Sequence, residues 1–364
     1  MGIKKIILNF VLTIINFFVG FKKIEKNKVT FVSLEENQPK DDFKLLYDKL
    51  STNNDLTIKL VLFNYNDKNL KNNFLYFLNC CKQIIQINTS KVVLLKDNNY
   101  VVSNFKRSGV IVVQLWHASG AIKKFGNVIK REYPIKNYNY VISNSKYWQE
   151  PYSKAFSVKK ENVLDLGMPR LDILYDKNKL QKESNKILIK YPNLKNKKIL
   201  LYAPTFRGNI YDGFKMLDFD ALKLMDSLDD EYILIYKLHP LMKNIKLIQN
   251  ERIIDLSNEN THALFGICDI LISDYSSIMF DFSILNKPMI SYVPDLSDYS
   301  NNLGLFIDYD DLPTIKAKDT NDLINAINKC NTNGINEFNK KYLGSSDGNN
   351  TQRVTKLINK LVND

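Results

Sequence analysis

The sequence predicts an α/β fold built from two Rossmann-like, doubly wound domains. Short runs rich in Ile, Leu and Val alternate with longer amphipathic stretches, and a polar, Lys-rich stretch at 175–198 divides these runs into two series. Uninterrupted apolar runs separated by helical spacers are typical of parallel strands covered by helices on both faces. The strand candidates are 28–34, 57–63, 91–95, 109–116 and 139–145, followed by 197–205, 232–239, 252–257, 269–274 and 288–293.

The two series of strands set the expected domain organisation. We expect a membrane-associating segment at 1–28, an N-terminal Rossmann-like domain at 29–185 and a C-terminal Rossmann-like domain at 186–345. The last stretch, 346–364, has amphipathic spacing and is predicted to be a closing helix.

The segment 1–28 carries the membrane character of the chain. Its apolar run, residues 6–21, is shorter than the roughly 20 residues that a spanning helix needs. On a helix, its polar and small residues would form one narrow stripe, which consists of Asn9, Thr13, Asn16 and Gly20. We therefore expect an amphipathic helix on the cytoplasmic face of the cell membrane, where flanking lysines would meet anionic headgroups. The alternative is a buried first helix of the domain.

The charge balance suggests a partner that bears phosphates, although a Lys- and Asn-rich composition on a solvated surface accounts for most of the excess. The chain of 364 residues has 51 Lys and Arg against 39 Asp and Glu, a formal net charge of +12. The lysines are spread along the chain and do not alternate with aromatic residues in one patch, so we expect no nucleic-acid partner. The 4 cysteines form neither a C-x-x-C pair nor a zinc-spaced cluster with histidines, which indicates a reduced protein with no metal site.

Polar residues follow the strand candidates, at the edge where open α/β sheets bind ligands. His117 comes directly after the strand at 109–116, and Ser119 and Gly120 allow a close backbone approach. A histidine in this position can accept a proton near neutral pH. Taken alone, a structural role for His117 is equally open. His262, just after a Thr that suits a helix N-cap, is expected to be structural.

Cationic residues follow three other predicted strands or loops. Lys237 and His239 are two residues apart, so on an extended segment they would point to the same side and suit a phosphate group. Arg207 leaves a strand tip beside Thr205, where a guanidinium can make a forked contact to phosphate oxygens. Arg170 lies in a Pro-bent loop.

The stretch "ILISDYSSIMFD" at 270–281 predicts an anion site. A buried strand ends at Asp274, and Ser276 and Ser277 open a helix whose free N–H groups, hydroxyls and positive dipole end would attract an anion. Asp281 would reach a sugar or glycerol hydroxyl. The simpler alternative is that Ser276 only caps the helix.

Five blocks together resemble the CDP-glycerol glycerophosphotransferase family, the teichoic acid primases and polymerases. They are "WHASGAIKKFG", "GMPRLD", "YAPTFRG", "YKLHP" and "ISDYSSIMFDFSILNKPMISY", and they occur in the family's order and spacing between about residues 100 and 355. The resemblance implies a GT-B-like fold with two domains facing a cleft, and no metal or cofactor besides the CDP-glycerol donor. "HASGA" is similar to the primase members, whereas "DGNNTQRV" (347–354) is similar to the extending enzymes.

The resemblance also implies an activity and residue roles. Glycerol phosphate would pass from CDP-glycerol to a polyprenyl-diphosphate-linked saccharide or glycerol-phosphate acceptor, with release of CMP. His117 would be the general base, and His239 with Lys237 would stabilise the donor pyrophosphate. The substrate-binding residues would be Ser119, Gly120, Arg170, Thr205, Arg207, Lys237, Asp274, Ser276, Ser277 and Asp281.

Three alternatives stay open at this point. A close variant uses CDP-ribitol as the donor. A GT-B sugar transferase would use the same helix start for any nucleoside diphosphate. A third possibility is a binding module that has lost catalysis, which the net charge of +12 supports.

Overall fold

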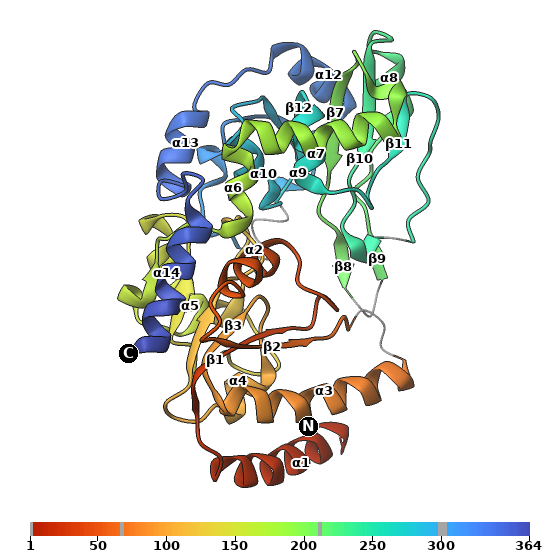
Figure 1. Ribbon diagram of the computed structural model, residues 1–364. Coiled ribbons are helices and arrows are strands. Elements are labelled where there is room, and N and C mark those ends of the chain that lie inside the picture. Colours follow the sequence, from red (N-terminus) through yellow and green to blue (C-terminus); the bar gives the residue numbers. More distant parts are fainter. Residues whose placement is uncertain (1–2, 66–68, 210–212, 243, 298–303) are drawn as a thin grey trace. The chain divides into compact units, whose positions relative to one another are not determined.

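The computed structural model describes residues 3–65, 69–209, 213–242, 244–297 and 304–364. The chain divides into two compact units (Figure 1). Unit 1 consists of Met1–His117, Phe125–Asp172 and Gly344–Asp364, and unit 2 of Ala118–Lys124 and Ile173–Leu343. Each unit is an α/β structure around its own parallel sheet, as the sequence predicts.

Unit 1 contains a six-stranded sheet with the order β2-β1-β3-β4-β5-β6, in which every neighbouring pair is parallel. Its strands are β1 (Glu25–Ser33), β2 (Thr57–Leu62), β3 (Ser90–Leu95), β4 (Ile111–Gln114), β5 (Tyr140–Ile142) and β6 (Val163–Leu164). The strand order reverses between β1 and β3, and such a switch point is where a doubly wound sheet binds its ligand.

Helices cover this sheet with apolar faces. They are α1 (Ile3–Gly20), α2 (Asp41–Leu50), α3 (Leu70–Asn88), α4 (Tyr100–Phe105), α5 (Gln149–Phe156) and α14 (Asn350–Asn363). From α14, Val354, Ile358 and Leu361 are buried with Phe31 of β1 and Phe43 of α2 in the core of unit 1. The C-terminal helix therefore completes unit 1, because its apolar stripe closes that core.

Unit 2 contains a second six-stranded parallel sheet, ordered β11-β10-β7-β12-β13-β14. Its strands are β7 (Lys198–Ala203), β10 (Tyr232–Tyr236), β11 (Ile253–Asp255), β12 (Ile270–Ser273), β13 (Met289–Tyr292) and β14 (Thr314–Ala317). Counted within the unit, this order is the 3-2-1-4-5-6 arrangement of a Rossmann sheet, with its switch point between β7 and β12.

The described helices of unit 2 lie around this sheet. They are α7 (Lys177–Lys190), α8 (Ala221–Asp226), α9 (Thr261–Ile267), α10 (Ile278–Ser283), α12 (Thr320–Lys329) and α13 (Ile335–Tyr342), and α6 (Asp172–Tyr175) leads into the unit. An antiparallel hairpin, β8 (Arg207–Asn209) and β9 (Gly213–Lys215), extends from the end of β7. The sequence analysis did not predict this hairpin.

The units differ from the predicted domain boundaries: the segments 1–28 and 346–364 belong to unit 1, and unit 2 ends at Leu343 rather than at residue 345. Unit 2 begins at Ile173 rather than at residue 186, because α7 packs against α9 and the Ser184 hydroxyl donates to the Ala263 carbonyl at 2.9 Å. The segment 118–124 also belongs to unit 2. It is held there by the backbone bond from Phe306 N–H to the Ile122 carbonyl, at 2.8 Å.

Helix α1 is attached to unit 1 through its narrow polar stripe. The Tyr100 hydroxyl donates to Asn9, and the Asn88 amide donates to Asn16 Oδ1 at 2.7 Å. Leu12 and Val19 are buried beside this stripe, whereas the phenylalanines of the helix are exposed. Within the described residues, none of the helices combines the length and the apolar character needed to cross a membrane.

Candidate active site

The loops at the switch point of unit 2 bring together half of the predicted substrate-binding residues. Thr205 and Arg207 follow β7, and Asp274, Ser276 and Ser277 follow β12. Because β7 and β12 are parallel neighbours, both loops leave the sheet at the same edge.

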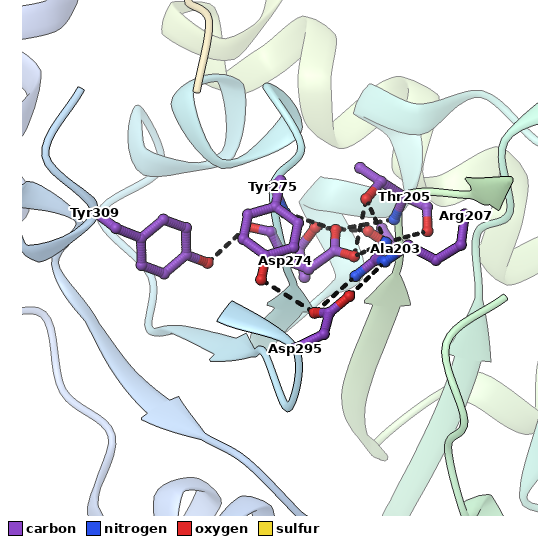
Figure 2. Close-up of polar contacts among 8 residues, drawn as sticks. Ala203, Thr205, Arg207, Asp274, Tyr275, Asp295 and Tyr309 are labelled. Carbon is purple, nitrogen blue, oxygen red and sulfur yellow. Dashed lines mark hydrogen bonds and ion pairs between the residues drawn. The ribbon is translucent and has the colours of Figure 1, made fainter. Parts of the chain in front are cut away.

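Asp274 is the centre of a hydrogen-bonded frame at this edge (Figure 2). Its carboxylate is buried and accepts from the N–H and the hydroxyl of Thr205 and from Arg207 Nη1, each at 2.9 Å. Burial raises the pKa of Asp274, and the Arg207 and Thr205 donors oppose that rise. The Tyr309 hydroxyl donates to the Asp274 carbonyl at 2.8 Å.

Arg207 is held by hydrogen bonds in the same frame. Its Nε and Nη2 donate to the two carboxylate oxygens of Asp295, at 2.8 and 3.2 Å, and the Tyr275 hydroxyl donates to Asp295 at 3.0 Å (Figure 2). The forked contact that the sequence analysis assigned to phosphate is made to a carboxylate instead. Arg207 and Asp274 thus fix the shape of the edge, which the sequence analysis did not foresee because Asp295 is remote in sequence.

Ser276 and Ser277 lie half-buried where the chain enters α10. Ser277 occupies the N-cap position, and the Ser276 hydroxyl accepts from Ile278 N–H at 3.4 Å. The helix itself is short, with 6 residues, and ends at Ser283. Its dipole is correspondingly weaker than expected, so the local N–H groups and hydroxyls matter more than the helix as a whole.

His239 follows β10 and lies against Phe206, with ring centroids 5.3 Å apart. Its Nδ1 accepts from Leu241 N–H at 3.2 Å, so the neutral ring carries its proton on Nε2. Burial lowers the pKa of His239, and Lys123 and Lys237 lower it further. At neutral pH this histidine is a neutral Nε2–H donor, which suits a phosphate oxygen.

Lys237, which also follows β10, contacts the neighbouring loop. Its amino group donates to the carbonyls of Ser257 and Glu259, at 2.6 and 2.8 Å, and so holds the loop after β11. These two contacts use two of the three N–H donors of the amino group, so the shared role of Lys237 and His239 at one phosphate group stays a prediction.

Lys123 is a cation at this edge that the sequence analysis missed. The segment that carries it pairs with residues 304–306, through an antiparallel bridge between Lys123 and Leu305. Its Nζ lies 5.7 Å from the centroid of the Phe206 ring, next to His239. Burial lowers the pKa of Lys123 to about 8, against the opposing effect of Asp274. In a chain with 51 Lys and Arg, the sequence offers no signal that would single this lysine out.

Ser119 and Gly120 lie on the same segment, and Ser119 is buried. Asp281 of α10 lies close to His262 of α9, with 3.5 Å between Oδ2 and Nε2. His262, which the sequence analysis took as structural, thus lies beside a predicted substrate-binding residue.

His117 lies at the corresponding edge of unit 1, after β4. Trp116 precedes it with φ 63°, a left-handed backbone conformation that is rare for a bulky residue. The Gln114 side chain supports this turn, since its Oε1 accepts from Trp116 N–H at 2.9 Å. Backbone strain of this kind is commonly kept where it orients a functional side chain, here the imidazole that follows.

The carboxylate of Glu35 lies beside His117, a neighbour that the sequence does not reveal. His117 Nδ1 lies 3.5 Å from Glu35 Oε1. Partial burial, followed in size by the charge of Asp97, raises the pKa of Glu35 to about 7. Lys96 forms a buried ion pair with Glu36 at 3.0 Å. These residues follow β1 and β3, the two strands that flank the switch point of unit 1.

Arg170 belongs to unit 1, where it is held by Asp42 of α2. Its N–H donates to Asp42 Oδ1 at 2.8 Å, and its Nη1 lies 3.5 Å from Oδ2. The structure therefore places two of the predicted site residues, His117 and Arg170, in unit 1 and the other predicted residues in unit 2. Over the described part of the chain, no cluster of three or more His, Cys, Asp or Glu side chains is arranged to hold a metal ion.

Two parallel Rossmann-like sheets with polar groups at their carboxyl edges define a protein of the GT-B-like fold class, whose sheets bind nucleotides at these edges. The family described as CDP-Glycerol:Poly(glycerophosphate) glycerophosphotransferase matches residues 14–360. The chain belongs to this family and is a transferase of teichoic acid biosynthesis, which confirms the resemblance seen in the sequence.

Several curated relatives support this assignment. The chain is 32% identical over 362 residues to the teichoic acid ribitol-phosphate primase of Bacillus spizizenii, which covers 93% of this chain and 92% of the relative. It is 35% identical over 288 residues to the teichoic acid glycerol-phosphate primase of Bacillus subtilis, which covers 74% of each. The teichoic acid poly(ribitol-phosphate) polymerase of Bacillus spizizenii is 35% identical over 290 residues, but the match spans only 46% of that relative.

Solved structures share the fold. The wall teichoic acid polymerase TagF matches with a TM-score of 0.76 over 99% of this chain and 95% of that chain, at 22% identity. A UDP-GlcNAc 2-epimerase from Neisseria meningitidis bound to UDP-GlcNAc matches with a TM-score of 0.56 over 92% of this chain and 99% of that chain, at 11% identity. At these identities the likeness is one of fold.

Proposed function

We propose that the protein transfers glycerol phosphate from CDP-glycerol to a hydroxyl of a membrane lipid-linked acceptor and releases CMP. The proposed acceptor is a polyprenyl-diphosphate-linked saccharide or glycerol phosphate. The observation that carries the proposal is the set of donors at the switch point of unit 2: the Nε2–H of His239, the amino group of Lys123, and the chain entering α10 at Ser276. Together they suit a diphosphate at the position where Rossmann sheets bind nucleotides.

In this proposal the donor's diphosphate lies against unit 2. Ser276 and Ser277 donate from their hydroxyls and from nearby N–H groups, while His239 and Lys123 compensate the charge that develops on the departing CMP. Thr205, Arg207 and Asp274 keep these loops in place through the frame of Figure 2. No metal or further cofactor takes part in the proposal.

His117 is the proposed general base. Its ring removes the proton from the acceptor hydroxyl as the oxygen forms a bond to the phosphorus that carries the glycerol. The bond between that phosphorus and the bridging oxygen breaks, and its electron pair leaves with CMP. The transfer needs the acceptor oxygen and the leaving oxygen in line at the phosphorus.

CDP-ribitol is the second candidate donor. The match to the ribitol-phosphate primase of Bacillus spizizenii, which extends over 93% of this chain, favours it. A ribitol chain offers more hydroxyls than glycerol, and Asp281 with His262 is the polar pair that we propose contacts them.

The experiment is an assay of CMP release from the full-length protein with a synthetic prenyl-diphosphate disaccharide as acceptor. CDP-glycerol, CDP-ribitol and a UDP-sugar are compared as donors, and His117→Asn and Asp48→Asn are compared as variants. We expect release from a CDP-alditol, a loss of about 100-fold or more in His117→Asn, and an unchanged rate in Asp48→Asn, because Asp48 is exposed and paired with Lys44. A folded protein that releases no CMP from either CDP-alditol contradicts the proposal.

The proposed location is the cytoplasmic face of the cell membrane, with α1 lying on the surface. Support comes from the side of α1 that unit 1 leaves uncovered, where Phe10, Phe17 and Phe18 are 66%, 64% and 64% exposed. Helix α3 packs beside α1 and exposes further apolar side chains, among them Phe74 at 61%. An apolar surface of this kind, flanked by lysines, suits an anionic bilayer, where a prenyl-linked acceptor would be found.

A further inference from the structure

Glu35 and His117 form a pair at the carboxyl edge of unit 1, with 3.5 Å between Oε1 and Nδ1. Resting on the proposed role of His117 as the base, we propose that Glu35 is its positioning residue. The Glu35 carboxylate accepts the Nδ1 proton of the imidazole, so that Nε2 is left unprotonated to take the acceptor's proton, and it then balances the charge of the imidazolium. Neither residue is recognisable as a partner of the other from sequence, since they are far apart along the chain.

A hydrogen-bonded frame fixes the backbone on both sides of this pair. On the Glu35 side, Glu35 N–H donates to the Ser33 hydroxyl at 3.1 Å, and that hydroxyl donates to Asp97 Oδ2 at 2.9 Å. On the His117 side, Gln114 Nε2 donates to the Asp97 carbonyl at 2.9 Å, and Gln114 Oε1 holds the Trp116 turn. Asp97 therefore ties together the loops that carry the two partners.

The charged residues around Glu35 favour a proton shared between Glu35 and His117. Asp97 and Glu36 raise the pKa of Glu35, while Lys96 and Arg170 lower it. On α2, Asp42 pairs with Arg170 and Asp41 lies 3.7 Å from Lys96, so both cations are already matched. A carboxylate in this setting gains from a positively charged partner, and the imidazole of His117, 3.5 Å away, is able to become one.

The chemistry of the pair is that of a carboxylate that holds an imidazole in one tautomer. The O–H bond of the acceptor breaks, its proton goes to Nε2, and the Nδ1 proton stays with the contact to Glu35. The present 3.5 Å separation is longer than a hydrogen bond, and catalytic hydrogen bonds commonly shorten when the substrate is bound. The side chains of His117 and Glu35 are 43% and 46% exposed, so there is space for this adjustment.

The test measures the pKa of His117 directly by NMR and, separately, the effect of Glu35 on the pH dependence of activity. In full-length protein, the ring proton signals of the 3 histidines are titrated by NMR, with His117→Asn used to assign the His117 signal. We expect Glu35→Gln to lower the pKa of His117 by about one unit or less, because an adjacent negative charge is lost and both groups are partly solvated. Glu35→Asp should keep part of the effect, and Asp48→Asn should leave the titration unchanged.

The kinetic arm follows CMP release from CDP-glycerol against pH with the same variants. Glu35→Gln should lower kcat on the order of tenfold with little change in the donor KM, and should move the acid limb of kcat/KM to lower pH. The acid limb should move to lower pH for the following reason. In the wild type, the pKa of this limb belongs to the coupled pair of His117 and Glu35, which share one proton, whereas in the variant it belongs to His117 alone.

Each result separates the inference from the function on which it depends. A His117 signal that titrates identically in wild type and Glu35→Gln overturns the positioning role, whatever the activity. So does a loss of activity in Glu35→Gln without a shift of the pH profile, since that pattern marks a structural effect. Full activity in His117→Asn instead contradicts the proposed function, and the NMR titration would still decide whether the two side chains are coupled.

Discussion

At the carboxyl edge of unit 2, the cationic side chains differ in how far carboxylates of the protein balance their charge. Arg207 is matched by Asp274 and Asp295, whereas Lys123 and His239 both have pKa values below their usual range, because burial and neighbouring cations disfavour their charged forms. Such a lowered pKa means that a positive charge on either residue costs free energy. A bound diphosphate would remove that cost, so these two residues, rather than Arg207, are the expected donor contacts.

The pH dependence of donor binding tests the role of Lys123. With a pKa of about 8, Lys123 loses its charge as the pH rises through that value, and its attraction for a diphosphate is lost with it. We therefore expect kcat/KM for CDP-glycerol to fall above about pH 8 in the wild-type protein. In Lys123→Arg the guanidinium stays charged, so this fall should move to higher pH.

Lys124 provides the matched control, because it is the adjacent residue on the same segment and is exposed. Lys124→Arg should reproduce the wild-type profile. If Lys123→Arg also reproduces it, the alkaline limb belongs to another group and Lys123 has no part in donor binding.

At the scale of elements, α1 combines a polar stripe that binds unit 1 with an apolar side that is left exposed. The sequence interpretation assigned the membrane role to the apolar residues and left a buried helix open as the alternative. The structure shows how both features occur in one helix, since Asn9 and Asn16 are used for docking and the phenylalanines remain outside.

Replacing exposed aromatic residues of α1 should weaken membrane binding without unfolding the protein. Phe17 and Phe18 are each 64% exposed, so Phe17→Ser/Phe18→Ser should leave thermal unfolding almost unchanged. Burial of two phenylalanine side chains in a bilayer contributes about 3 kcal/mol, which predicts a loss of binding of about 100-fold. The measurement is co-sedimentation with vesicles that contain phosphatidylglycerol.

Ile189 of α7 is a suitable control, because it is 74% exposed and belongs to unit 2. Ile189→Ser should sediment with vesicles as the wild type does. Equal sedimentation of the wild type and the double Phe variant would exclude α1 as the membrane-binding surface.

The sequence predicts those elements that follow from a local pattern of residues. It does not predict those that depend on contacts with residues remote in the chain. The strand candidates were found because their Ile, Leu and Val runs are strong, and each contains or overlaps a parallel strand of the structure. Strand β6, with 2 residues, and β14, with the half-polar sequence TIKA, have no such pattern. The assignment of residues 118–124 to unit 2 depends on backbone pairing with 304–306, which no local signal reveals.

The same distinction applies to the candidate site. Strand ends pointed to His117, His239 and the serines at 276 and 277, since position along the sheet follows from chain order. The partners of Lys237 and Arg207 within the protein are set by tertiary contacts, which the local sequence does not reveal. Glu35 was missed for the opposite reason, because its importance arises only from its distance to His117.

For the whole molecule, the two units have separate cores and separate switch points, so ligand binding should be detectable unit by unit. If the donor binds unit 2, CDP-glycerol should slow amide hydrogen exchange in the loops after β7, β10 and β12 and at the start of α10. At 100 times its Kd, the ligand adds about 2.7 kcal/mol to the stability of the state that binds it, which corresponds to roughly 100-fold slower exchange by openings that release it. The loops of unit 1 around Glu35 and Asp97 should change little with the donor alone.

The variant Ser276→Ala/Ser277→Ala makes this prediction specific. Both serines are partly exposed, so the double variant should fold, yet it should lose most of the donor-induced protection after β12 because two hydroxyl donors are gone. CMP, which has one phosphate where CDP-glycerol has two, should protect the same loops less strongly than the donor in the wild-type protein. Protection that appears only in unit 1, or that is unchanged in the double serine variant, would mean that the nucleotide is recognised elsewhere. In that case the anion-binding role of the chain between β12 and α10 would have to be abandoned, while the fold and the family assignment would be unaffected.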